Sequence, residues 1–403
     1  MIKPISLVLA AALAAPLFAQ DAAQPQVPVR KLGAIVAKGT ENVGPSIVVR
    51  QTSQGVLVNS QSRQRIWAFD PTLARATLVV DSGTATQFHA GALIPFTGDS
   101  SLLVDIPSQS LLVVGPDGDP KKARAMAMPI AADVPFIAIP AAFGRATLDK
   151  EGRLIYRGQV RKPIRPDESG MKMTAILADS SPILLADFDK RTVDTLGWIS
   201  TPNPAKMSMV PKASGGMAIK MLLNPVPELD EWALLSDGTI AILHSHDYRI
   251  DWIDPDGTKR GSPKMPFAWR RFTDEEKQKL ADSIADLART QIKNQLASNP
   301  AAAQISIDLQ IVPLNEMPDY WPPIQQGGGS VRADLDGNLW ILPQTAIKPA
   351  AGFVYDVVNR KGDVFERVEM PPGATIAGFA PGGKVYLTIS EGTNTYLGLA
   401  KLR

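Results

Sequence analysis

The chain has no cysteine and only three histidines in 403 residues. Without cysteine it can form neither a disulfide framework nor a lipid-modified anchor, so its own hydrophobic core must hold the fold together. An excess of one charge is missing too, since 42 lysines and arginines stand against 40 aspartates and glutamates. This balance, without a clustered basic stretch, excludes the electrostatic footprint of a nucleic-acid-binding protein.

Long apolar runs are also scarce, and the one that stands out lies at the N-terminus. MIKPISLVLAAALAAPLFAQ starts with the basic residue Lys3, continues with an apolar run and reaches Ala19 before Gln20. The pattern predicts a secretory signal peptide over residues 1–19, because the run is too short to span a bilayer. We therefore expect an exported monomer, periplasmic or secreted, with no transmembrane segment after cleavage.

What the chain does contain is a repeated pattern of short strands and tight turns. WALLSDGTIAILHSHDYRIDWIDPDG (232–257) holds three strands, with Asp and Gly where hairpin turns need a positive φ. A β-rich run follows each copy of the first turn. The copies of that turn are TSQG (52–55), TGDS (97–100), DKEG (149–152), SDG (236–238), DLDG (334–337) and APGG (380–383).

Six units of this kind predict an all-β fold, a six-bladed β-propeller with four-stranded blades over residues 20–403. A β-sandwich is the rival, but it would not produce the internal periodicity. The sixth unit reaches Arg403 with only three strands, whereas VRKLGAIVA (29–37) forms a strand without a unit of its own. We expect this N-terminal strand to complete the last blade and close the ring, which removes open sheet edges.

At this level the chain resembles bacterial secreted six-bladed β-propellers of the NHL-repeat and TolB-like type. The resemblance lies in DLDGNLWIL (334–342), SDGTIAIL (236–243) and the W-I-D-P-D-G turn. It implies an architecture and not an activity, because such folds host binding scaffolds, hydrolases, lactonases and lyases.

Two insertions interrupt the repeat, one over residues 157–182 in the third blade and one over about 267–328 between blades four and five. Both connections emerge on the same side of a meandering ring, so we expect one elaborated face that carries the function. The second insertion begins with a predicted helix near 273–298, which we expect to pack on the ring as a lid. Thr273 and Glu276 fit a capping box there, and the apolar stripe is Leu280, Ile284, Ala288, Ile292 and Leu296.

His244, His246 and Asp247 fall between the second and third strands of blade four, on the elaborated face. The two histidines could share one side of a strand and bind a metal, but a catalytic zinc ion wants three protein ligands. The remaining histidine, His89, is expected nearer the channel. We therefore predict no metal and no cofactor, and interpret the segment as a polar blade loop, with ligand contact as the alternative.

Positive charge and aromatic rings supply the other candidate positions. Arg157, Arg161 and Arg165 cluster in the first insertion, and Tyr320 with Trp321 offers a stacking surface or packs against the helix. With the histidines, these residues would form one patch suited to an anionic peptide or glycan. A second group, on first strands that could face the channel, would suit an anion or form ordinary salt bridges; it consists of Arg50, Arg145 and Arg332.

No nucleophile, base or ligand set converges in the sequence. The main hypothesis is therefore a non-enzymatic binding or scaffold module for a protein, peptide or glycan. The alternative is a metal-dependent lactonase, hydrolase or lyase with its site on the loop-rich face or in the channel. Glu228, Asp230 and Glu231 precede one inner strand and could serve it, but no matching acidic set is evident on the other blades.

Overall fold

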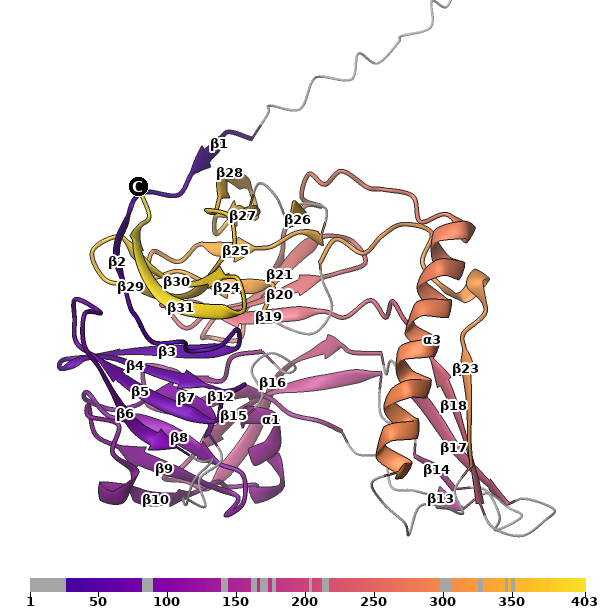
Figure 1. Ribbon diagram of the computed structural model, residues 1–403, viewed down its shortest axis with the longest axis horizontal. Helices are drawn as coiled ribbons and strands as arrows, with labels where there is room; N and C mark the ends of the chain where they lie inside the picture. The colour runs from indigo at the N-terminus through magenta and orange to yellow at the C-terminus, as the bar shows by residue number, and fades with distance from the viewer. Residues whose placement is uncertain are drawn as a thin grey trace, which may run out of the picture.

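The computed structural model describes residues 27–81, 90–138, 144–160, 165–166, 173–175, 179–202, 205–211, 217–297, 306–324, 329–344, 347–348 and 352–403. The predicted signal peptide, His89 and Arg161 lie outside these ranges. Within them, six sheets of four antiparallel strands form the blades of a propeller (Figure 1), as the repeated unit predicts. In the same ranges, no helix combines the length and the apolar character needed to cross a bilayer.

The first three blades lie in chain order. Blade 1 consists of β3 (Ile47–Thr52), β4 (Gly55–Ser60), β5 (Arg65–Phe69) and β6 (Ala76–Asp81). Blade 2 consists of β7 (Ala90–Pro95), β8 (Ser101–Asp105), β9 (Ser110–Val114) and β10 (Arg124–Ala127). Blade 3 consists of β11 (Thr147–Leu148), β12 (Leu154–Arg157), β15 (Ser180–Asp187) and β16 (Thr192–Ser200). Within blade 2, η1 (Pro120–Lys122) lies between β9 and β10. Between blades 2 and 3 the chain forms two more short helical turns, η2 (Ala131–Asp133) and α1 (Val134–Ala138).

The last three blades complete the ring. Blade 4 consists of β19 (Glu231–Leu234), β20 (Ile240–His244), β21 (Arg249–Ile253) and β22 (Lys259–Gly261). Blade 5 consists of β24 (Val331–Ala333), β25 (Leu339–Ile341), β27 (Gly352–Val358) and β28 (Val364–Glu369), and the short β26 (Ile347–Lys348) pairs with β27. Blade 6 consists of β29 (Ala374–Ala380), β30 (Lys384–Glu391), β31 (Asn394–Lys401) and, from the N-terminus, β2 (Ile35–Lys38).

Each predicted first turn connects the first and second strands of its blade. In DLDGN, the Asp334 carboxylate accepts hydrogen bonds from the backbone N–H groups of Asp336 and Asn338 at 2.9 and 2.8 Å. It also accepts one from the indole N–H of Trp340 at 2.9 Å. Gly337 has φ +82°, which side chains adopt only with strain. The aspartates of these turns therefore build hairpins.

The hydrophobic core is divided among the boundaries between blades. Six clusters of buried side chains each join two neighbouring blades, so every blade packs on both sides. The cluster that closes the ring places Val58 and Phe69 of blade 1 against Tyr386 and Leu397 of blade 6. Closure therefore rests on apolar burial between the two ends of the chain.

The N-terminal segment fastens two blades. β2 pairs antiparallel with β31, with Ile35 opposite Ala400, and supplies the fourth strand of blade 6 as predicted. Before it, β1 (Val29–Lys31) pairs parallel with β28 of blade 5, a contact that the repeat did not predict. Arg30 adds an ion pair of 2.7 Å with Glu366.

A further five-stranded sheet, called here the added sheet, stands beside the ring with α3 (Asp274–Ala297) along it (Figure 1). Its strands come from the β12–β15, β16–β19 and β22–β24 connections, which emerge on one face of the ring. One face is thus elaborated, although the β17–β18 hairpin was not predicted. The strands are β13 (Arg165–Pro166), β14 (Met173–Ala175), β17 (Ala205–Pro211), β18 (Met217–Leu223) and β23 (Ser306–Ile311).

The capping box of α3 is present, because the Glu276 N–H donates to Thr273 Oγ1 at 3.3 Å and the Thr273 N–H donates to Glu276 Oε2 at 3.2 Å. The buried side of the helix is centred on Ala281, which packs with Val312 and Met317. This cluster is separate from the six blade clusters. The expected lid therefore packs on the added sheet and on the segment after β23, which includes η4 (Leu314–Glu316).

Candidate functional site

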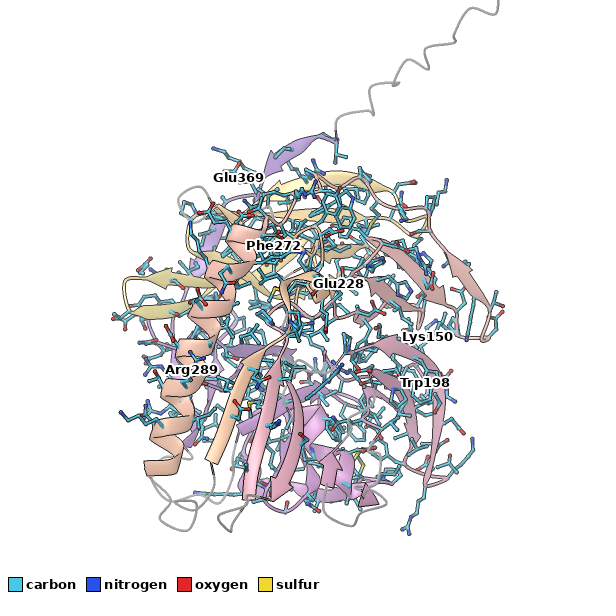
Figure 2. The ribbon with its side chains drawn as sticks, turned by 90° about the vertical axis from the view of Figure 1, so that its right-hand side faces the viewer. Lys150, Trp198, Glu228, Phe272, Arg289 and Glu369 are labelled. Atoms are coloured by element: carbon cyan, nitrogen blue, oxygen red, sulfur yellow. The ribbon has the colours of Figure 1, made fainter. Side chains whose placement is uncertain are left out.

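Among the described residues of the elaborated face, one cavity lies beside blade 4 and another lies at the centre of the ring. The first, called here the blade-4 pocket, has a volume of about 520 Å³. His244 and His246 line it, together with Glu228, Asp230 and Met317. Figure 2 shows Glu228 where the added sheet meets the ring, on the segment between β18 and β19.

His244 is held between two carboxylates. Its Nδ1 lies 3.0 Å from Asp230 Oδ2 and its Nε2 lies 2.8 Å from Asp251 Oδ2. The hydrogen bond to Asp230 raises the pKa of His244, and Asp251 adds to this effect against the burial that lowers it. Both ring nitrogens donate when the imidazole is charged. His244 therefore joins two carboxylates of blade 4, and no ring nitrogen is left to act as a base.

His246 is placed differently. Its Nδ1 lies 3.0 Å from Glu228 Oε2, and its side chain is 79% exposed. Glu228 thus orients the imidazole of His246 and leaves its Nε2 directed away from this contact. Asp247 binds Lys264 at 2.8 Å and Arg249 at 3.4 Å, and the hydrogen bond with Lys264 is the largest cause of its lowered pKa. Asp247 is therefore already neutralised by neighbouring cations.

The second cavity, called here the channel cavity, has a volume of about 190 Å³. Side chains and backbone of blades 1, 3, 5 and 6 line it, which is possible only at the centre of the ring. Ser46, Arg145 and Gly329 precede the first strands of their blades, so the cavity lies at the elaborated end of the channel. No carboxylate belongs to its lining among the described residues.

Arg145 and Arg332 carry the charge of the channel cavity. Nη2 of Arg145 donates to the Ala377 carbonyl across the channel at 2.9 Å. Nε and Nη1 of Arg332 are buried and, within the described part of the chain, have no hydrogen-bond partner. Burial lowers the pKa of Arg145 well below its ordinary value, and the charge of Arg332 lowers it further. Two poorly solvated cations therefore share one small cavity.

Glu231 interacts electrostatically with Arg332 and with Arg157. Burial lowers the pKa of Arg157, while the Glu231 carboxylate acts in the opposite direction. Glu231 also favours the charged form of Arg332, whose pKa burial lowers. Glu231 is only 7% exposed. This carboxylate of blade 4 thus stands among arginines of blades 3 and 5.

Of the single patch expected from the sequence, His244, His246 and Asp247 line the blade-4 pocket, whose described lining includes none of the other predicted residues. Arg157 interacts with Glu231 of blade 4, Arg165 belongs to β13 of the added sheet, and Arg161 lies outside the described residues. Trp321 packs on Phe272 with ring centroids 4.1 Å apart. Arg157 ends β12 of blade 3, whereas Arg165 belongs to a strand of the added sheet.

Tyr320 remains 47% exposed and meets Trp269, which is 42% exposed, edge to face at 6.1 Å. Of the arginines expected at the channel, Arg145 and Arg332 converge and Arg50 does not. Nη2 of Arg50 donates to the Ser100 carbonyl at 3.4 Å, in a turn at the opposite end of the ring.

A catalytic zinc ion is generally held by three protein side chains around one point. Within the described ranges, no three His, Asp or Glu side chains gather in this way. In addition, the guanidinium groups of Arg145 and Arg332 line the channel cavity and would repel a cation there. The described residues therefore do not form a zinc site of this kind, and the two arginines disfavour a metal ion in the channel cavity.

Comparison with known proteins shows that the chain is similar to them in fold alone. No family model matches the chain, and no curated protein matches it. A gluconolactonase from Xanthomonas campestris is 9% identical with a TM-score of 0.43, over 92% of this chain and 98% of that one. A virginiamycin B lyase from Staphylococcus aureus is 10% identical with a TM-score of 0.41, over 91% of this chain and 98% of that one. Regucalcin, a calcium-binding protein from Agrobacterium tumefaciens, is 10% identical with a TM-score of 0.43, over 93% of this chain and 97% of that one.

At such identities and TM-scores, the similarity carries no argument about activity. The class of six-bladed β-propellers is confirmed by the sheets of this chain, whereas the finer resemblance to NHL-repeat and TolB-like proteins stays a prediction. The names of these neighbours are those of enzymes and of a calcium-binding protein.

Proposed function

We propose that this propeller binds an anionic ligand in the channel cavity, through Arg145 and Arg332. The observation that supports the proposal best is the buried part of the Arg332 guanidinium, which has no acceptor among the described residues. A buried cationic donor without an acceptor costs free energy, and an anion that accepts from it removes this cost. If the predicted signal peptide is functional, binding takes place outside the cytoplasm.

The size of the cavity limits what can enter. A volume of about 190 Å³ corresponds to roughly six water molecules at about 30 Å³ each. A single anionic group fits, either as a small free anion or at the end of a glycan or an acidic peptide. Arginine suits this role because its planar donors match carboxylate, sulfate and phosphate oxygens.

Thermal unfolding with added anions tests the proposal. Sulfate, phosphate, acetate and malonate are added at constant ionic strength to the wild type, Arg332→Met and Arg50→Met. A bound anion stabilises the folded state, by about 2.7 kcal/mol at one hundred times its Kd. We expect the wild type and Arg50→Met to respond to at least one anion, and Arg332→Met to lose the response. Equal responses in all three proteins contradict the proposal.

Glycan and peptide ligands form separate arms of the same experiment. A sulfated and an uncharged oligosaccharide, and an acidic peptide with its amidated counterpart, are compared with the free anion. If only the sulfated oligosaccharide raises the melting temperature, the ligand is an anionic glycan. If only the acidic peptide raises it, the ligand is an acidic peptide.

An enzyme is the second candidate, supported by one specific contact in the blade-4 pocket. Glu228 orients His246 through Nδ1 and leaves Nε2 for a substrate, the arrangement of a carboxylate-assisted general base. A panel of activated esters and lactones tests it. We expect His246→Gln to lower any hydrolysis rate by at least ~100-fold, the usual range for a general base. The Arg50→Met variant, whose side chain contacts a turn at the opposite end of the ring, is expected to retain the activity. Equal rates in His246→Gln and wild type contradict this candidate.

A further inference from the structure

We infer that the ligand of the channel cavity presents an anionic group that carries no proton, such as a sulfate, sulfonate or carboxylate, and that the site discriminates against inorganic phosphate. The inference rests on the proposed function and adds the chemical class of the anionic group to it. It follows from the groups that line the cavity, which offer free hydrogen-bond donors but no charged acceptor among the described residues.

Arg332 supplies the first free donors. Its Nε and Nη1 are buried and, in the described part of the chain, donate to no acceptor. Arg145 lines the same cavity and donates from Nη2 to the Ala377 carbonyl at 2.9 Å. A guanidinium group has no acceptor of its own, so these two side chains can only donate to a ligand.

Neutral side chains of the lining add further donors. The Gln61 amide donates to the Ala138 carbonyl at 3.0 Å, and its oxygen accepts from Ser46 Oγ at 3.1 Å. An amide nitrogen carries two hydrogens, so one remains for a ligand. The hydroxyl groups of Thr375 and Thr388 bond to each other, which uses one of their two hydrogens. Gln61 and the threonine pair therefore each keep one hydrogen that they can donate.

The acceptors of the lining are neutral. The Ser46 carbonyl already accepts from the Gln61 N–H at 3.0 Å, and the Ala377 carbonyl already accepts from Arg145. A hydrogen bond to an ionised acceptor is about twice as strong as one between neutral groups. Inorganic phosphate keeps a proton near neutral pH, and its O–H group would meet only neutral acceptors beside two guanidinium groups. Sulfate has no proton to place, so every one of its oxygens can accept.

The test compares three anions of equal charge. At pH about 8.5, sulfate, hydrogen phosphate and methyl phosphate are mainly divalent, and only hydrogen phosphate keeps a proton. Titration calorimetry at constant ionic strength measures their affinities for the wild-type protein. We expect sulfate and methyl phosphate to bind at least about tenfold more tightly than hydrogen phosphate. Methyl phosphate shows whether the proton or the phosphorus atom is responsible.

A substitution at Ser46 adds the missing acceptor. Ser46 lines the cavity and is half-buried directly before β3, which leaves room for a larger side chain. We expect Ser46→Asp to lower the affinity for sulfate at least about tenfold, because two negative charges repel each other. Its affinity for hydrogen phosphate should change by less than about threefold, since the carboxylate accepts the proton. Ser46→Asn has the same shape without the charge and is expected to keep the preference of the wild type.

The outcomes separate this inference from the proposed function. Equal affinities of the wild type for sulfate and hydrogen phosphate overturn the inference, while the loss of both in Arg332→Met still supports an anion site. Methyl phosphate as weak as hydrogen phosphate, or an equal loss of both anions in Ser46→Asp, also contradicts it. If sulfate, methyl phosphate and malonate all fail to bind to the wild type, the proposed function itself fails. Circular dichroism reports whether each variant folds, and the three anions on the wild type decide the question should Ser46→Asp not fold.

Discussion

The hydroxyl group of Tyr248 donates a hydrogen bond of 2.8 Å to the carboxylate of Asp356, across the boundary between blades 4 and 5. Both side chains are almost completely buried, and Arg367 donates to the other oxygen of Asp356 at 2.8 Å. Burial raises the pKa of Asp356, against the effect of these two donors. The contact therefore satisfies a carboxylate that would otherwise be poorly solvated between two blades.

From this contact we predict that Tyr248→Phe destabilises the ring. Hydrogen bonds to charged groups contribute about 1.5–3 kcal/mol, and the phenylalanine ring keeps the packing. We expect the free energy of unfolding in urea to fall by about 2 kcal/mol. Tyr320→Phe is the matched control, because Tyr320 lies on the surface. A loss no greater than in the control would show that Asp356 needs only Arg367.

The N-terminal strand gives a second prediction about stability. A protein that starts at residue 39 lacks both β1 and β2, whereas one that starts at residue 27 keeps both strands and the Pro28 carbonyl that accepts from Arg367. Removal of β2 exposes the edge of β31 and breaks its backbone hydrogen bonds, each worth about 1 kcal/mol. We expect the shorter protein to melt at least several degrees lower, measured by calorimetry, and the longer one to match the wild type. Identical melting temperatures would refute closure through this strand.

The contacts of His244 make the folding stability of this protein depend on pH. Its pKa is raised in the folded state, chiefly by the hydrogen bond to Asp230. The stabilisation is therefore complete below the unfolded pKa of about 6.5 and is lost as the pH rises through the higher folded value. We expect the stability difference between wild type and His244→Gln to shrink as the pH is raised above about 6.5. His246→Gln serves as the control, and a difference that grows with pH would contradict the assignment.

We predict that the propeller ring folds without the helix α3. Its buried residue Ala281 belongs to a cluster outside the six that join the blades. We expect a protein in which a long Gly/Ser linker replaces residues 274–297 to keep a cooperative unfolding transition and its β-sheet spectrum. Loss of the soluble folded protein would mean that the ring depends on the added sheet.

The sequence alone was sufficient to predict the propeller, the closing strand and the helix. Each of these follows from local patterns: turns with Asp and Gly at a fixed place in the unit, an N-terminal strand without a unit, and the capping box from Thr273 to Glu276. Such features depend on residues close in sequence, so they can be read without knowing the neighbours in space.

Only the tertiary structure decided how the functional side chains group. The added sheet joins segments from three connections, and the channel cavity joins Arg145 of blade 3 to Arg332 of blade 5. His244 was expected in a polar loop, but Asp230 and Asp251 engage both of its nitrogens. Pairing and burial of charges depend on which distant segments meet when the ring closes, and no local pattern in the sequence encodes that meeting.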